Sequence, residues 1–271
     1  MTSTAVISKA RYILGTKAIG HMGTLDPQGT GVLLAGVGKA TRLFDYFLGS
    51  DKEYVAEFEF GYTTDTLDPE GQVTASTCVL PTKSAILKAL APLCGVVDQM
   101  PPIYSAKSIN GVRAYDLARQ GKIVELKTAR VEVKRLELLE QTGDNKYRFF
   151  IECSSGTYIR SICRDLSESL GSLACMTSIH RKRSGSFLDT TATTLEQLEK
   201  FKNNALISVE SALDHLERRD FDDSLYNKIL NGIKLDTPPS DKPFTVYCQN
   251  KLFGIGKSVD GKLKIPTFLL D

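Results

Sequence analysis

The sequence GHMGTLDPQGTGVLL occupies residues 20–34 and carries the strongest local signal in the chain. It places four glycines, one histidine and one aspartate within a dozen residues and then continues into an apolar run. Glycine is favoured where the backbone turns sharply or approaches another molecule closely. A carboxylate between such glycines is presented to another molecule, which makes Asp26 the leading candidate for a catalytic residue.

Asp26 also fits an ordinary turn. A proline moves the residue before it out of the helical region, and an aspartate there can cap its own backbone. The tripeptide Leu-Asp-Pro recurs at residues 67–69, between two strand-like runs, where it is predicted to be a connecting loop. The tripeptide alone therefore does not identify a catalytic site, and both interpretations of Asp26 stay open on local sequence.

Composition limits the class of protein. With 271 residues, 42% of them hydrophobic, the chain is long enough for one large and one small domain. The formal net charge is +2, so a nucleic-acid site has to be a local basic patch. The six cysteines include no CxxC pair and mostly lie in apolar stretches, which favours buried free thiols over a zinc or redox site.

The sequence contains no recognisable targeting or membrane signal. The start of the chain lacks the continuous apolar core of a secretory signal. No apolar run approaches the roughly 18 residues that a spanning helix needs. These features predict a cytoplasmic protein without a membrane-spanning segment.

Hydrophobic periodicity predicts a chain of mixed helices and strands. Apolar residues three and four positions apart predict helices, and strict alternation predicts strands with one buried face. The predicted helices cover residues 3–14, 39–48, 81–94, 113–120, 159–170, 194–216 and 221–235, with a capping box at Thr194 and Gln197. The predicted strands cover residues 53–63, 131–140, 147–153 and short segments within 244–268, with turns at 143–145 and 260–261.

Two side chains outside the glycine-rich stretch are candidates for a site. Tyr54 begins the apolar face of the strand at 53–63, either as a core residue or as a flat ring for stacking on a base. Arg160 lies at the edge of the apolar stripe of the helix at 159–170, where it either pairs with a carboxylate or reaches solvent. Spacing alone does not choose between these alternatives.

Two segments are rich in basic residues. Residues 107–135 contain eight lysines and arginines but only three acidic residues, and residues 180–183 are His-Arg-Lys-Arg. Such runs are usually solvated surface. Their density also suits contacts with the phosphates of a nucleic acid.

Four motifs, in their order and spacing, resemble those of the bacterial tRNA pseudouridine synthase B family. They are GHMGTLDPQGTGVL at 20–33, SDKEYVAEFEFGYTTDTLDPEG at 50–71, QMPPIYSAKSINGVRAYDLARQG at 99–121 and SSGTYIRSICRDLSESLG at 154–171. The resemblance extends over roughly residues 2–190 and is highly specific. It implies that the chain converts the uridine at position 55 of the tRNA T-loop into pseudouridine.

The resemblance implies an α+β architecture, the pseudouridine synthase fold. A central, mostly antiparallel mixed sheet flanked by helices is expected, with the catalytic cleft along its middle. Residues 1–220 are expected to form the catalytic domain, and residues 221–271 a small β-rich module similar to the RNA-binding PUA module. Family members begin with a further strand and a Lys-Pro turn, so one sheet edge is expected to be unpaired here.

The family pattern implies a central role for three residues. Asp26 is the expected catalytic carboxylate, and Tyr54 is the ring expected to stack on the flipped uracil. Arg160 is the expected partner of the Asp26 carboxylate. An opposite charge at close range favours the ionised form, so Arg160 is expected to keep Asp26 charged.

The family pattern also implies the surroundings of that site. Tyr158 and Ile179 are expected to line the pocket, and His21 to contact the T-loop where the target base leaves its stack. The implied reaction uses base flipping and neither a metal nor a cofactor. The expected partner is the T-arm of tRNA, bound by a monomer that needs no other protein.

Two other functions fit part of the sequence. One is a catalytically impaired RNA-binding protein that helps tRNA fold, although the intact set of Asp26, Tyr54 and Arg160 favours an enzyme. The other is glycoside hydrolysis through Asp26. It is disfavoured because no second carboxylate in an equivalent site is apparent in the sequence.

Overall fold

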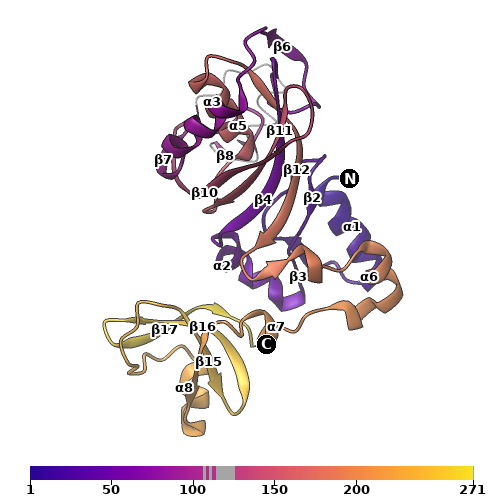
Figure 1. Ribbon diagram of the computed structural model, residues 1–271. Helices are drawn as coiled ribbons and strands as arrows, with labels where there is room; N and C mark the ends of the chain where they lie inside the picture. The colour runs from indigo at the N-terminus through magenta and orange to yellow at the C-terminus, as the bar shows by residue number, and fades with distance from the viewer. Residues whose placement is uncertain (106–107, 110–111, 114–125, 271) are drawn as a thin grey trace. The chain divides into compact units, whose positions relative to one another are not determined.

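The computed structural model describes residues 1–105, 108–109, 112–113 and 126–270 (Figure 1). The chain divides into two compact units, each assembled from separate segments. The first contains Met1–Ser3, Gly23–Leu34 and Tyr46–Ala192, and the second contains Thr4–Met22, Ala35–Asp45 and Thr193–Asp271. The glycine-rich stretch therefore contributes to both units.

One open mixed sheet forms the first unit. Its strands are β13 (Phe187–Leu188), β12 (Ala174–Ser184), β4 (Lys52–Phe60), β11 (Lys146–Cys153), β10 (Ala129–Gln141) and β7 (Gly95–Gln99), in that order. Neighbours on this path run antiparallel, and the short strand β2 (Thr30–Gly31) pairs with β12 in parallel. The expectation of a mostly antiparallel mixed sheet is confirmed.

Two helices cover one face of this sheet. Helix α5 (Ile159–Ser169) packs against β12 and β4, and α3 (Lys83–Leu90) packs against β10 and against α5. Alternation in β4 turns Tyr54, Ala56, Phe58 and Phe60 toward the core. The apolar stripe of α5 covers them, and burying such side chains stabilises a fold by about 1.5–3 kcal/mol each.

The second unit contains two smaller apolar clusters. Helix α1 (Ser3–Leu14) packs against the two-stranded sheet of β1 (Ile19–His21) and β3 (Ala35–Val37) through Ile7, Ala10 and Ile19. The C-terminal sheet has the order β14 (Glu217–Phe221), β15 (Phe244–Cys248), β16 (Lys251–Val259) and β17 (Lys262–Phe268). Helix α8 (Tyr226–Leu230) closes its core. The predicted β-rich C-terminal module is present.

The structure corrects several predicted helices. Residues 39–48 form the 3-10 helix η1 (Gly38–Leu43) followed by the short helix α2 (Phe44–Leu48). The predicted helix at 194–216 stops after α6 (Leu195–Phe201), because Lys202 has a positive φ of 46°. Its capping box at Thr194 and Gln197 is confirmed.

Further segments of the chain complete the two units. After α6 come η4 (Lys202–Ala205) and the short helix α7 (Val209–Ala212). Strands β5 (Tyr62–Thr64) and β6 (Val73–Ser76) frame the second Leu-Asp-Pro tripeptide. The helix predicted at 113–120 lies outside the described residues, apart from the end of β9 (Val112–Arg113). No helix in the described ranges combines the length and apolar character needed to cross a bilayer.

Candidate active site

The loop that carries Asp26 is a tight turn held from both sides. The Gly29 amide donates to the Asp26 carbonyl at 2.7 Å, which closes a turn over Pro27. Before the turn, the Leu25 amide donates to Ser3 Oγ at 3.0 Å, and the Ser3 hydroxyl donates to the Leu25 carbonyl at 3.2 Å. The backbone on which Asp26 stands is therefore fixed.

Arg160 is the ion-pair partner of Asp26, as the family pattern implied. Its Nη2 lies 2.9 Å from Asp26 Oδ1, and its side chain is 8% exposed against 26% for that of Asp26. Arg160 comes from the first turn of α5, while Asp26 comes from the loop before β2. Folding thus brings together two side chains 134 positions apart in the chain.

The second Leu-Asp-Pro tripeptide also reaches this site, which corrects its interpretation as a mere connecting loop. Asp68 Oδ2 lies 3.3 Å from Arg160 Nη1, and the Asp68 side chain is only 4% exposed. Thr66 Oγ1 and the Glu70 amide donate to Asp68 Oδ1 at 2.6 and 3.1 Å. A second carboxylate is therefore present beside Asp26. Because Asp68 is buried and held by Thr66 and the Glu70 amide, it serves to hold Arg160 in place.

The Arg160 guanidinium joins four acceptors from three segments. Besides the two carboxylates, Nη1 donates to the Thr66 carbonyl at 2.9 Å and Nη2 to the Tyr104 carbonyl at 3.1 Å. A planar guanidinium is suited to several acceptors in fixed directions. The alternative in which Arg160 reaches solvent is wrong.

Burial raises the pKa of Asp26 above its ordinary value, and the positive charge of Arg160 opposes that shift without cancelling it. Asp68 adds a like charge that also raises it, while Arg181 lowers it. Arg160 thus acts in the expected direction. Desolvation nevertheless makes Asp26 a more basic carboxylate than one in water.

Tyr54 and Ile179 lie beside the same loop. Tyr54 is 8% exposed, and burial raises the pKa of its hydroxyl to about 12, with Asp26 among the charges that act on it. Ile179, on β12, has its Cγ2 3.5 Å from the point where a Cβ of Gly29 would stand. Tyr54 belongs to the core cluster, so packing holds its ring in place.

The other two predicted site residues are placed as follows. Tyr158 occupies the N-cap position of α5, two residues before Arg160. Its amide donates to the Gln99 side chain at 2.8 Å, and its carbonyl accepts from that side chain at 3.1 Å. His21 ends β1 and belongs to the second unit. Within the described residues, no three His, Cys, Asp or Glu side chains are arranged to hold a metal ion.

Gly31 determines how closely the loop approaches the sheet. A Cβ at Gly31 would lie 2.2 Å from the Arg181 carbonyl oxygen, and Gly31 has a φ of +93°. We expect Gly31→Ala to lower the free energy of unfolding by roughly 2–4 kcal/mol through this clash and backbone strain. Gly20→Ala is the matched control, since its Cβ would meet no atom within 4 Å. Urea unfolding checks this, and equal midpoints for both variants would refute it.

Two family models match consecutive parts of the chain. One, described as the N-terminal domain of TruB family pseudouridylate synthases, matches residues 11–159. The other, described as the tRNA pseudouridylate synthase B C-terminal domain, matches residues 160–218. The first match alone covers more than half of the chain and contains Asp26, Tyr54 and Tyr158.

Curated relatives agree with these models. A protein of Clostridium perfringens (strain SM101 / Type A) is 35% identical over an alignment covering 100% of this chain and 96% of the relative. One of Clostridioides difficile (strain 630) is 37% identical, with 95% and 90% covered. One of Caulobacter sp. (strain K31) is 41% identical, with 80% and 71% covered. Each is named tRNA pseudouridine synthase B.

Solved structures share the fold. A chain in "Crystal Structure of a Cbf5-Nop10-Gar1 Complex" matches with a TM-score of 0.74 at 24% identity, covering 100% of this chain and 81% of that one. A chain in "Structure of H/ACA RNP bound to a substrate RNA containing 2'-deoxyuridine" gives 0.73 at 22%, covering 100% and 82%. Fold and family models together define a pseudouridylate synthase. Within that class, the chain belongs to the TruB family.

Proposed function

We propose that this protein isomerises uridine to pseudouridine in tRNA, at position 55 of the T-loop, with Asp26 as its catalytic carboxylate. The observation that carries the proposal is the half-buried Asp26 carboxylate held 2.9 Å from Arg160. Membership of the TruB family supports the reaction class, since the relatives described above are named tRNA pseudouridine synthase B. The T-arm is the proposed binding partner of a monomeric, cytoplasmic enzyme.

The reaction rearranges bonds without a net redox change. The C1′–N1 bond of the uridine breaks, the uracil turns within the site, and a C1′–C5 bond forms while C5 loses its proton and N1 gains one. Asp26 serves this either by attacking C1′ or by removing the C2′ proton, and both routes need the ionised carboxylate. Arg160 supplies the fixed positive charge that stabilises that form in a desolvated site.

The flipped base is proposed to stay between rigid walls while it turns. Extruding a base costs a few kcal/mol, which stacking on an aromatic ring offsets. Tyr54 supplies the ring, because its core packing holds it in place without substrate. Ile179 and Tyr158 are proposed to close the pocket, and His21 to contact the T-loop where the base has left.

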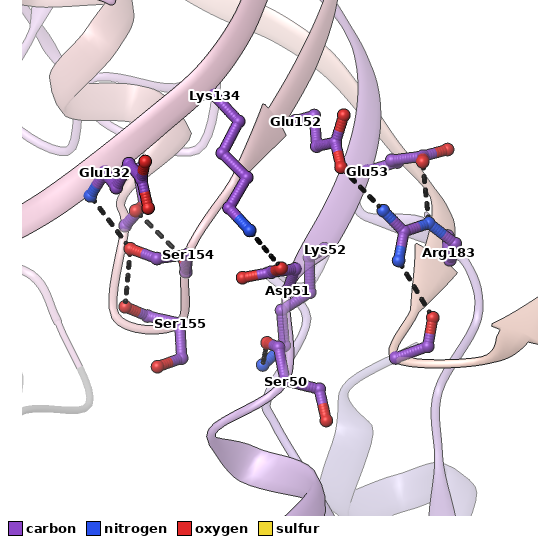
Figure 2. A network of polar contacts seen from close by, with 12 residues as sticks. Ser50, Asp51, Lys52, Glu53, Glu132, Lys134, Glu152, Ser154, Ser155 and Arg183 are labelled. Atoms are coloured by element: carbon purple, nitrogen blue, oxygen red, sulfur yellow. Dashed lines mark hydrogen bonds and ion pairs between the residues drawn. The ribbon is translucent and has the colours of Figure 1, made fainter. Parts of the chain in front are cut away.

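Phosphate contacts are proposed for the basic segment 107–135 and for the C-terminal module predicted at 221–271, following the catalytic domain at 1–220. In the described part of that segment, Lys134 Nζ lies 2.5 Å from Asp51 Oδ2 (Figure 2). Arg135 Nε lies 2.7 Å from Glu137 Oε1. Exposed ion pairs contribute little to stability, so both cations can exchange their partners for phosphates at small cost.

We expect activity to fall in acid at a higher pH than an ordinary aspartate would impose. Burial raises the pKa of Asp26 above 3.8, and only the ionised form reacts, so kcat/KM falls about tenfold per pH unit below that raised pKa. The fold also binds this proton more tightly than the unfolded chain, so ionising Asp26 lowers stability as pH rises through that window. A pH profile of kcat/KM that stays flat down to pH 4 would contradict the assignment.

Mapping the modified base tests the proposed function. Purified protein is incubated with an unmodified T-arm hairpin, and pseudouridine is located by carbodiimide labelling and primer extension. We expect one stop, at the uridine equivalent to position 55, and none in a hairpin with cytidine there. Tight binding without any stop would support the RNA-folding helper, and free uracil in the supernatant would support glycoside hydrolysis.

A further inference from the structure

Arg181 is a buried arginine that the mechanism above does not use. It lies on β12 and is 2% exposed, although sequence places it in the basic cluster 180–183 considered for phosphate contact. Within the described ranges, no carboxylate lies within ion-pair distance of its guanidinium. A buried charge is costly unless it is hydrogen-bonded, so its acceptors indicate what it does.

The acceptors of Arg181 flank Asp26 on both sides. After the turn, Nε donates to the Val32 carbonyl at 2.7 Å. Before the turn, Nη2 donates to the Gly23 carbonyl at 3.1 Å and Nη1 to the Thr24 carbonyl at 3.4 Å. One planar group therefore ties together the two ends of the loop that carries the carboxylate.

The same guanidinium reaches the aromatic wall of the site. The positive charge of Arg181 lowers the pKa of the Tyr54 hydroxyl, which burial raises to about 12, and Arg181 faces Tyr54 in the pairing of β12 with β4. The backbone of Arg181 is engaged as well, since its carbonyl accepts from the Val32 amide at 2.9 Å. Gly31 leaves the space for this approach.

We propose that Arg181 is a positioning residue for the isomerisation, holding the Asp26 loop and the Tyr54 ring in register. Arginine suits the role because it offers five donors in a rigid fork, whereas lysine concentrates three donors at one point. A lysine placed there cannot reproduce the spread of donors that bonds the Val32, Gly23 and Thr24 carbonyls. The proposal rests on the proposed function, because positioning is judged by the rate of that reaction.

The neighbours of Arg181 separate it from the rest of the basic cluster. His180 bonds Thr30 Oγ1 and Asp189 Oδ2, each at 2.8 Å, and Lys182 lies 3.0 Å from Asp189. Arg183 lies 2.6 Å from Glu53 and 2.9 Å from Glu152. Figure 2 shows both carboxylates turned toward its guanidinium. The acceptors of Arg183 are thus two partly exposed carboxylates and the Gly185 carbonyl, and none belongs to the Asp26 loop.

Arg183→Lys is therefore the matched control for Arg181→Lys, two positions away on the same strand. We expect Arg181→Lys to lower kcat about 10–100-fold with KM for the T-arm changed less than about threefold, as for a misplaced catalytic group. Its acid limb should stay in place, because lysine keeps the positive charge through which Arg181 lowers the pKa of Asp26. Arg183→Lys should change kcat by less than about twofold. It should move the acid limb by no more than about a few tenths of a pH unit.

Chemical rescue distinguishes positioning from general damage. Arg181→Ala leaves a guanidinium-sized space, and we expect 10–20 mM guanidinium to raise its kcat at least about fivefold, while the same concentration of ethylammonium does not. If Arg181→Ala fails to fold, Arg181→Lys decides the matter. An Arg181→Lys enzyme with wild-type kcat, or one changed only in KM, overturns the proposal.

A readout without catalysis keeps this test apart from that of the function. Amide hydrogen exchange of peptides spanning residues 23–34 should speed up in Arg181→Lys but not in Arg183→Lys. Absence of pseudouridine with the wild-type protein would refute the proposed function alone. Unchanged exchange of those peptides in Arg181→Lys would refute the positioning role, whatever the activity.

Discussion

Asp26→Asn is expected to abolish pseudouridine formation while leaving the protein folded and able to bind tRNA. Asparagine keeps the size of the side chain, and its carbonyl oxygen can still accept from Arg160 Nη2, which lies 2.9 Å from the present Oδ1. It can neither attack C1′ nor remove a proton. We expect the single-turnover rate to fall by at least about a thousandfold, with tRNA affinity within about threefold.

Asp68→Asn is the matched control, because Asp68 also lies in a Leu-Asp-Pro tripeptide and also contacts Arg160. Asp68 is fixed by Thr66 Oγ1 and the Glu70 amide and is 4% exposed. Substrate is therefore expected to meet Asp26 and not Asp68. We expect a loss of about 10–100-fold from a looser Arg160. A larger loss for Asp68→Asn than for Asp26→Asn would show that the catalytic role had been given to the wrong carboxylate.

Arg160→Ala is expected to have the largest effect on stability. It leaves two neighbouring carboxylates without their cation, one of them 4% exposed, and leaves the Thr66 and Tyr104 carbonyls without this donor. Removing one partner of a buried pair costs about 3–5 kcal/mol. The free energy of unfolding in urea at pH 7 measures the loss, and the isomerisation rate should fall at least about a hundredfold.

The pH dependence identifies the cause of that loss. Burial raises the pKa of Asp26, so acid neutralises this stranded carboxylate and the difference from wild type should shrink as pH falls toward 4. Arg160→Lys keeps the positive charge but not the forked donors of the guanidinium. It should lose less stability than Arg160→Ala. A loss of stability under 1 kcal/mol at pH 7 would mean that the pair contributes little to the fold.

Sequence patterns predicted the elements in which apolar and polar residues lie on opposite faces. The alternation in β4 and the helical stripe of α5 placed Tyr54 and Arg160 correctly on their elements. Periodicity could not show that Arg160 meets Asp26, because that pairing depends on how distant segments fold together. It came from the resemblance, and the distance of 2.9 Å now supports it.

Two features escaped prediction for physical reasons. Strand β12 was missed because it carries several charged residues, which sequence patterns assign to the surface. In the structure, its arginines have partners in neighbouring segments. Asp68 was taken for part of a connecting loop because its tripeptide lies between two strand-like runs, and local sequence does not show where a loop folds back. The burial of Arg181 was not predicted either, since an arginine that donates to backbone carbonyls looks like a surface charge in sequence.

Tritium release from unmodified tRNA labelled at uracil C5 measures the chemistry itself, because forming the C1′–C5 bond expels that hydrogen. With the wild-type protein we expect release to reach one tritium per target uridine, with no free uracil. Asp26→Asn should release none above background. Release by Asp26→Asn at the wild-type rate, or tRNA binding by the wild type without release, would contradict an isomerase that works through Asp26.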